Sequence, residues 1–193
     1  MNYIGQVLQK TVLHAASDAY VTEYFTYDYD NAGRLQDTYH RLKISNTYMD
    51  EVCLEHNNYN EIGQLASRVI GNGQETQQFT YNIRGWTTDI SGDYFGEHLY
   101  YETKRDGSNG RFNGNISQHD IRYRAGGYGG LEQLQFDNTY DQLNRLTESR
   151  ISGGEFYQFG ENIDYDKHGN ITSLHRGGIS EHAWILGGEC ADA

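Results

Sequence analysis

The chain has 193 residues, about the length of one domain, and its hydrophobic share of 36% and mean hydropathy of −0.81 are low for a globular protein. Aromatic residues nevertheless make up 13%, including 17 tyrosines, and disordered chains are poor in aromatics, so we expect a fold whose buried surface is largely tyrosine. The net charge of −12 argues against nucleic-acid and anionic-membrane binding, and no apolar run is long enough to span a bilayer.

Twenty-three glycines and no proline favour strands joined by tight turns. Proline removes a donor from a strand ladder, whereas glycine supplies the positive φ of tight turns. In chain order, residues 10–20 are the one helix-tolerant stretch, which we still interpret as loop plus strand. Residues 20–27 then alternate with the strand period of two, Tyr and Thr on one face and Glu, Phe and Tyr on the other.

A short pattern recurs along the whole chain: an aromatic residue, a polar pair, Gly or Asn, a polar residue, then an aliphatic one. The copies are Tyr29–Leu35, Tyr59–Leu65, Tyr81–Trp86, Tyr140–Leu146 and Tyr165–Ile171, with a shortened copy at Phe112–Ile116 and a clipped one at Tyr3–Val7. Successive turn residues are 22 to 30 residues apart, a period typical of solenoids, propellers and arrays.

Each copy predicts a β-hairpin. The Asp or Asn bonds its own backbone in the turn, and Gly or Asn in the left-handed conformation closes the turn with a bulge. The aromatic residue and the aliphatic one are expected to pack together and against the next copy. The predicted structural residues are Tyr29, Gly33, Leu35, Tyr59, Gly63, Leu65, Tyr81, Gly85, Trp86, Gly114, Tyr140, Asn144, Leu146, Tyr165, Gly169 and Ile171.

Glycine-rich stretches between the copies predict turns at the opposite end of the hairpins. They are Gly71-Asn72-Gly73, Gly107-Ser108-Asn109-Gly110, Gly126–Gly130 and Ser152-Gly153-Gly154. None is long enough for a domain linker, so we expect one all-β array over residues 1–193. A lone hairpin is marginally stable, and neighbouring hairpins must therefore stabilise one another.

The motif Tyr-Asp-x-x-Gly-Arg-Leu, seen at Tyr29–Leu35 and nearly so at Tyr140–Leu146, resembles the YD repeat of Rhs proteins. The stretch Phe79–Trp86 and the later Phe112–Ser117 resemble segments common in Rhs proteins of Bacteroidetes. The resemblance covers essentially the whole chain. It implies a curved, spiralling antiparallel sheet that forms part of a hollow shell, as in polymorphic toxins, toxin-complex cocoons and teneurins.

The same resemblance implies a function. Such shells enclose or display a C-terminal toxin, effector or contact domain, so the expected partners are the rest of the shell and its cargo. A secreted or cell-surface location follows from the family alone, because residues 1–10 show no secretory signal pattern.

Two departures from the family predict that the chain is a fragment of a larger shell. Seven hairpins are too few to enclose a cavity. The proline-containing Asp-Pro-x-Gly-type motif that usually ends toxin-bearing shells is absent, and the residues after Arg176 are too few for a toxin.

No catalytic, metal or cofactor site is expected. The acidic runs beginning at Asp28 and Asp164 lack the oxygen ligand at the fifth position and the Glu at the twelfth position of a calcium loop. The eight histidines show no metal-ligand spacing. No set of nucleophile and base or of metal ligands has usable spacing, so we expect no enzyme. Cys53 and Cys190 leave two alternatives, a single bridge or two free thiols, and we favour free thiols.

The alternative function is a carbohydrate-binding or cell-surface adhesion module. Exposed tyrosines stack on sugar rings, and Tyr81 and Trp86 are the residues we would test first. The repeat-core interpretation of the same tyrosines needs no ligand.

Overall fold

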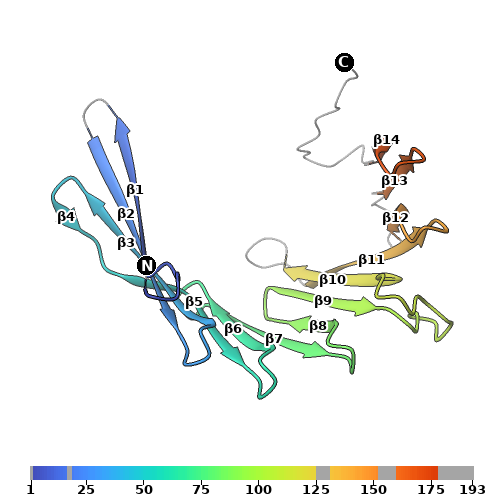
Figure 1. The fold of residues 1–193 in the computed structure, drawn as a ribbon, viewed down its shortest axis with the longest axis horizontal. Coiled ribbons are helices and arrows are strands. Elements are labelled where there is room, and N and C mark those ends of the chain that lie inside the picture. Colours follow the sequence, from blue (N-terminus) through green and yellow to red (C-terminus); the bar gives the residue numbers. More distant parts are fainter. Residues whose placement is uncertain (1, 17–18, 125–130, 152–159, 178–193) are drawn as a thin grey trace. The chain divides into compact units, whose positions relative to one another are not determined.

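The computed structural model describes residues 2–16, 19–124, 131–151 and 160–177. These residues form fourteen β-strands and no helix, which confirms the all-β class (Figure 1). Within the described part of the chain, no helix is long and apolar enough to cross a membrane. The chain divides into two compact units, Met1–Gly96 and Glu97–Ala193. The single array over residues 1–193 stays a prediction.

The first unit is an antiparallel sheet of successive hairpins with the order β1-β2-β3-β5-β6-β7-β8, and β4 pairs with β3 alone. Its strands are β1 (Gln9–Ala16), β2 (Ala19–Tyr29), β3 (Leu35–Ile44), β4 (Thr47–Tyr48), β5 (Val52–Tyr59), β6 (Leu65–Ile70), β7 (Glu75–Tyr81) and β8 (Thr87–Ser91). Residues 10–20, interpreted as loop plus strand, are strand over residues 10–16 in β1 and 19–20 in β2, and residues 17–18 lie outside the described residues.

The second unit repeats the plan with the order β9-β10-β11-β12-β13-β14. Its strands are β9 (Phe95–Tyr100), which contains the boundary between the units, β10 (Gln118–Arg124), β11 (Leu131–Tyr140), β12 (Leu146–Ile151), β13 (Gly160–Tyr165) and β14 (Ile171–Gly177). The antiparallel hairpin array predicted from the sequence is therefore confirmed in both units.

The predicted bulge is present in every full copy of the repeat. The strand register shifts directly before Tyr29, Tyr59, Tyr81, Tyr140 and Tyr165. Each tyrosine then pairs with the residue that begins the return strand, Leu35, Leu65, Thr87, Leu146 and Ile171 respectively. An extra residue before the turn strengthens the local twist of the hairpin.

The predicted opposite-end turn at residues 71–73 is confirmed, with Asn72 at φ 58° and Gly73 at φ 87° between β6 and β7. A turn is also present at the predicted residues 107–110, where Gly107 has φ 80°, but the end of the hairpins at which it was expected is wrong. This segment joins β9 to β10, at the same end of the second unit as the repeat turns at Asn144 and Gly169. The predicted turns at residues 126–130 and 152–154 lie outside the described residues.

The likeness of this turn to the repeat turns was not predicted, because Lys104 occupies the position of the repeat's Asp or Asn. The N–H of Gly107 donates to the carbonyl of Lys104 (2.9 Å), and the N–H of Lys104 donates to Ser108 (2.8 Å). The repeat turn Asp30–Arg34 has the same two backbone bonds, both at 2.9 Å. Backbone geometry is therefore preserved where the sequence pattern is not.

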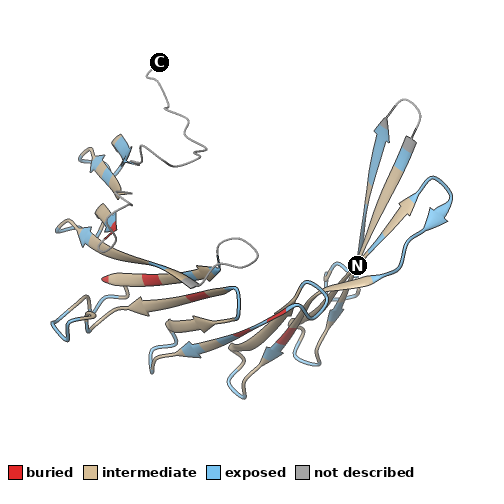
Figure 2. Ribbon diagram, turned by 180° about the vertical axis from the view of Figure 1, so that it is seen from behind, coloured by how far each residue is buried: buried red, intermediate tan, exposed pale blue. Residues whose placement is uncertain are grey.

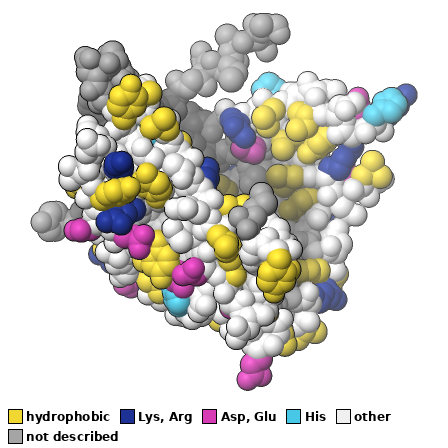
Figure 3. Space-filling view, turned by 60° about the vertical axis from the view of Figure 1, so that its left-hand side comes forward, with side chains coloured by type: hydrophobic (Ala, Val, Ile, Leu, Met, Phe, Trp, Pro, Cys, Tyr) yellow, Lys and Arg dark blue, Asp and Glu magenta, His cyan; other side chains and the backbone are white. Residues whose placement is uncertain are grey.

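A conventional apolar core is absent from the described residues. Ile151, 9% exposed, is the single buried apolar side chain among them, and most strand residues are half-buried (Figure 2). The buried polar residues are Asn57, Glu75, Gln77, Ser117 and Asp120. Hydrophobic side chains come to the surface at scattered places in the space-filling view (Figure 3). A sheet of this kind depends on its backbone ladder and on contacts between neighbouring side chains.

Candidate functional site

The repeat turns are built around one side-chain oxygen. Oδ1 of Asp30 accepts the backbone N–H groups of Ala32 and Arg34, both at 2.9 Å. Five further turns have the same two bonds, accepted by Asn2, Asn60, Asn82, Asp141 and Asp166. Both Asp and Asn offer this oxygen, which explains why the repeat accepts either residue.

Each turn is closed by a residue with positive φ, which we call the closing residue. Gly33, Gly63, Gly85, Gly114 and Gly169 have φ between 79° and 93°, and Asn144 has φ 62°. The predicted left-handed conformation is confirmed at all six. In the clipped first copy Gly5 closes the turn at φ 85°, and Asn2 takes the acid position. Tyr3 lies at the tip of that turn, 98% exposed.

The repeat tyrosines join each hairpin to the preceding one. The hydroxyl of Tyr59 donates to the carbonyl oxygen of Leu35 at 2.7 Å. The other pairs are Tyr29 to Val7 (3.0 Å), Tyr81 to Leu65, Tyr140 to Ile116 and Tyr165 to Leu146 (each 2.8 Å). In every pair the acceptor lies two residues after the closing residue. The predicted aliphatic position of the repeat is therefore also a backbone acceptor.

Near the turns, the backbones of neighbouring hairpins are no longer paired. There the tyrosine hydroxyl supplies the hydrogen bond that a backbone N–H supplies elsewhere in the sheet. Each hairpin pairs with the next one along their neighbouring strands. The last pair before the turns joins the residue four after the closing residue of the first hairpin to the residue three before the repeat tyrosine of the second. The terminal pairs are Gln9↔Thr26, Asp37↔His56, Ser67↔Gln78, Gln118↔Asp137 and Glu148↔Asn162. Four of these five hydroxyl–carbonyl bonds are partly buried, and the bond to Val7 is exposed. A carbonyl shielded from water is costly without a donor, so the tyrosine hydroxyl satisfies the next carbonyl beyond the last pair.

The residue after the closing residue also contacts the next hairpin. The guanidinium of Arg34 lies 4.3 Å from the ring centre of Tyr59, and that of Arg145 lies 4.5 Å from Tyr165. At the first turn, Nε2 of Gln6 donates to the carbonyl of Gly33 at 2.8 Å. These contacts explain the Arg of the motif, which sequence reasoning recorded without finding its partner.

The same geometry shifts the pKa of several groups. Hydrogen bonds from the backbone of Arg34 lower the pKa of Asp30, and those from Arg145 lower the pKa of Asp141. Burial raises the pKa of Tyr140 and of Tyr59 above their ordinary range. The carboxylates are thus held ionised and the phenols protonated, the forms that the turn bonds and the tyrosine–carbonyl bonds require.

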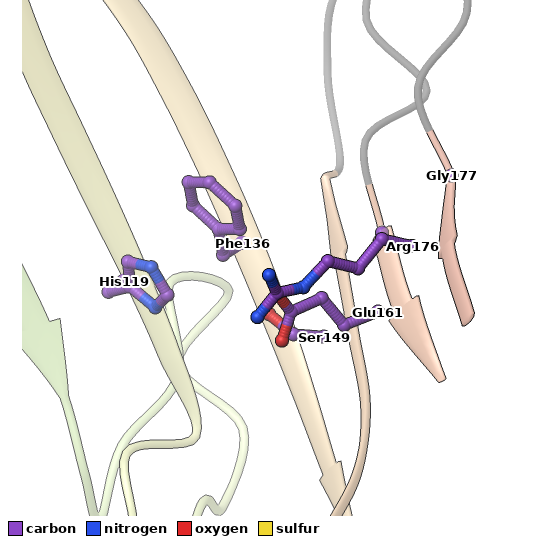
Figure 4. Close-up of a pocket in the computed structure, with 7 residues that line it drawn as sticks. His119, Phe136, Ser149, Glu161, Arg176 and Gly177 are labelled. Carbon is purple, nitrogen blue, oxygen red and sulfur yellow. The ribbon is translucent and has the colours of Figure 1, made fainter. Parts of the chain in front are cut away.

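The second unit also has a hollow of about 330 Å³ on the surface of β10–β14, which sequence reasoning missed (Figure 4). His119 and Phe136 stack with ring centres 4.3 Å apart, and Arg176 and Glu161 form an ion pair at 2.8 Å. Ser149, Gly160 and Gly177 complete the lining. Burial lowers the pKa of His119, which favours its neutral ring.

A polar network holds the connection between β9 and β10, which is formed by residues 101–117. Arg105 pairs with the buried Asp120 at 2.6 Å, and Tyr100 donates to the same carboxylate at 3.4 Å. Gln133 and Gln135 contribute further donors to it. The hydrogen-bond acceptors of the Arg105 guanidinium are 15 or more residues away, so no short sequence pattern signalled this network.

The structure describes the residues of the rejected metal loops and most of the histidines. Glu23 lies between His14 (2.7 Å) and His40 (3.1 Å), and its hydrogen bond with His14 lowers its pKa. Within the described ranges, no group of three or more His, Cys, Asp or Glu side chains is arranged to hold a metal ion. Cys53 is a free thiol, and Cys190 lies outside the described residues.

Tyr81 and Trp86, the residues expected to face a sugar, are both half-buried. Tyr81 is engaged in the contact with Leu65, and the guanidinium of Arg84 lies 5.1 Å from the ring centre of Trp86. Their substitution would therefore disturb the sheet as well as any ligand.

No family model matches the chain, and no curated protein matches it. Among solved structures, the crystal structure of TcdB2-TccC3 is similar over 92% of this chain, with a TM-score of 0.52 and 12% identity, and the match spans only 11% of that chain. A porin-like protein from Bacteroides uniformis matches 87% of this chain and 86% of its own, with a TM-score of 0.36 and 11% identity. At this identity, the likeness to TcdB2-TccC3 shows a common β-fold.

Proposed function

We propose that this chain is a structural Rhs-type repeat segment of a secreted or cell-surface protein. In that role it contributes to a β-shell that encloses or displays a C-terminal toxin, effector or contact domain, and it catalyses no reaction itself. The observation that carries the proposal is the tyrosine–carbonyl contact, which links one hairpin to the next at five places.

Two further observations support the proposal. TcdB2-TccC3, whose crystal structure contains a similar fold, comes from a toxin complex, and the match spans a small part of it. The described strands also bury almost no apolar side chain, as expected of a wall whose stability depends on its neighbours.

The test is the mass of the native polypeptide, measured by immunoblot of source cells with an antibody against this segment. A band far above 22.1 kDa is expected, since a shell needs many more hairpins. A single band at 22.1 kDa from a soluble, monodisperse and cooperatively melting species would overturn the shell role.

The hollow on β10–β14 favours a second candidate, a carbohydrate-binding module. A flat aromatic pair beside a carboxylate and a guanidinium provides both stacking and hydrogen bonding for a sugar. A glycan array would show binding that Arg176→Ala abolishes and that Lys167→Ala, on the turn at the opposite end of the β13–β14 hairpin, retains. A glycan array on which the chain binds no glycan would contradict the carbohydrate-binding function.

A further inference from the structure

The short hairpin that β3 forms with β4 departs from the repeat plan of the first unit. β3 pairs with β5 over residues 37–40, and beyond them Lys43 and Ile44 pair with the two residues of β4 (Figure 1). Ser45, at φ 53°, lies in the turn between the two strands, and the N–H of Met49 bonds back to β3 at 2.8 Å. The tyrosine–carbonyl bonds involve no residue of β4, so this hairpin is an addition to the repeat.

Four side chains of β2, β3 and β4 lie together on one face of this part of the sheet. Arg41 and Lys43 are two residues apart in β3, so their side chains point to the same side. Tyr24 of β2 pairs with Arg41, and Tyr48 of β4 pairs with Lys43. Directly paired residues of an antiparallel sheet share a face, so these four side chains form one group, which we call the Tyr–cation cluster.

The ring of Tyr48 holds both cations of the Tyr–cation cluster. The guanidinium of Arg41 lies 4.8 Å from its ring centre, and the ammonium of Lys43 lies 5.2 Å from it. The ring centre of Tyr24 is 6.0 Å away, and Tyr48 is 50% exposed. Two neighbouring like charges repel each other, and the negative face of an aromatic ring offsets part of that repulsion. The cluster therefore presents two positive charges side by side at the surface.

No carboxylate of the described residues neutralises these two charges. Arg41 donates from Nε to the carbonyl of Met49 at 3.0 Å, and within the described ranges neither Arg41 nor Lys43 forms an ion pair. By contrast, Arg34 in a repeat turn pairs with Asp30 at 2.6 Å. In a chain with a net charge of −12, two adjacent cations without an acid indicate a site for an anionic group.

The surroundings of the cluster favour a sugar with a single carboxylate. A guanidinium and an ammonium bind a carboxylate through charge-assisted hydrogen bonds, and exposed tyrosine rings and hydroxyls contact a sugar ring. A polyanion such as a nucleic acid would be repelled by Asp50 and Glu51, which are exposed and follow Met49 directly. One carboxylate is therefore a better match than a run of negative charges.

We propose that the Tyr–cation cluster binds a sugar acid, a pyranose ring that carries one carboxylate, at the end of a glycan. The carboxylate lies between Arg41 and Lys43, and the sugar ring lies against Tyr48 and Tyr24. The site is formed within the first unit alone. It goes beyond the shell role and is separate from the hollow on β10–β14.

The test is a titration of the ¹⁵N-labelled full chain with methyl β-D-glucuronide, followed by the amide resonances of Lys43 and Tyr48. The matched ligand is methyl β-D-glucoside, which has a hydroxymethyl group in place of the carboxylate. We expect the glucuronide to shift these resonances saturably and the glucoside to bind at least about tenfold more weakly, the effect of one charge-assisted hydrogen bond. Sodium acetate at the same concentration should shift them less, because it lacks the sugar ring.

Two variants distinguish the cluster from a general effect of charge. Lys43→Gln removes one cation and leaves the bond from Arg41 to Met49 in place, so it should weaken glucuronide binding about tenfold. Lys10→Gln is the matched control. Lys10 also lies over an aromatic ring, 5.7 Å from the ring centre of Phe25, but on the opposite face of the sheet. This variant should bind the glucuronide as the original chain does.

Any of four results would overturn the proposal: no shift with the glucuronide, equal binding of the glucuronide and the glucoside, equal shifts with acetate, or equal losses in the two variants. The shell role is tested by the native mass, on which none of these results bears. The two proposals can therefore fail separately.

Discussion

Two connections of the second unit both reverse the chain between neighbouring strands, but different interactions hold them. The repeat turn at Tyr140–Leu146 is held by bonds within itself and by one hydroxyl to the neighbouring hairpin. The connection at residues 101–117 has a similar backbone turn but is held by the half-buried Arg105, which pairs with the buried Asp120 of β10 and donates to the carbonyl of Phe136 in β11. The comparison teaches that repeated local bonds leave a trace in the sequence, whereas an anchor formed between distant residues does not.

The largest effect is expected from removing the anchor of the 101–117 connection. Arg105→Met leaves Asp120, which is 7% exposed, without its cation, and should lower the free energy of unfolding by about 3 kcal/mol. Urea unfolding followed by circular dichroism measures the change. The double variant Arg105→Met/Asp120→Leu should recover most of the loss. A single variant within about 1 kcal/mol of the original would contradict the role of the pair.

A smaller loss is expected from Gly110→Ala in the same connection. A Cβ at this position would overlap the carbonyl oxygen of Tyr101 and the side chain of Ser117, at a cost of about 2 kcal/mol. The matched control is Gly107→Ala, where a Cβ has open space but the left-handed backbone alone costs about 1 kcal/mol. If thermal melts gave the two variants the same loss, the close approach at Gly110 would be unimportant.

For the repeat turn, removal of one hydroxyl should cost about 1 kcal/mol. Tyr165→Phe leaves the carbonyl of Leu146 without its side-chain donor. Tyr140→Phe should cost less, because Nδ2 of Asn138 still donates to the carbonyl of Ile116 at 3.0 Å. The exposed Tyr20→Phe is the control, with no expected change in urea midpoint. The reverse order of the two repeat variants would argue against this account.

The smallest effect concerns pH. The folded-state pKa of Asp141 is below its ordinary value of 3.8, so its contribution to stability is complete above that pH and is lost as the pH falls through the folded pKa. Asp141→Asn retains the oxygen but does not titrate, as in the Asn60 and Asn82 turns. Its stability should therefore fall less between pH 5 and pH 2 than that of the original chain. Parallel acid titrations of the two proteins would disprove this.

The contrast between local bonds and contacts of distant residues also explains which parts of the fold and of the candidate site could be predicted from the sequence. Gly33 and Asp30 carry the local turn chemistry in their identity and spacing, so the hairpins, the bulges and the left-handed residues could be predicted. The hydroxyl contact from Tyr59 to Leu35 spans 24 residues, and the pattern indicated the packing but not the bond. The glycines near residue 107 indicated a turn, but not its likeness to the repeat turns or the end at which it lies. The hollow beside Phe136 depends on side chains from distant strands, for which the sequence offers no short signal.

The tyrosine–carbonyl contact also constrains how such a gene changes its length. Each hairpin supplies a donor to the hairpin before it and an acceptor to the one after it, so a whole hairpin is an exchangeable module. An in-frame duplication or deletion that spans one tyrosine and one closing residue leaves every remaining donor matched with an acceptor. A duplication or deletion that includes the tyrosine but not the closing residue leaves a hydroxyl donor or a carbonyl acceptor without its partner. Selection should therefore favour lineages that gain or lose complete hairpins.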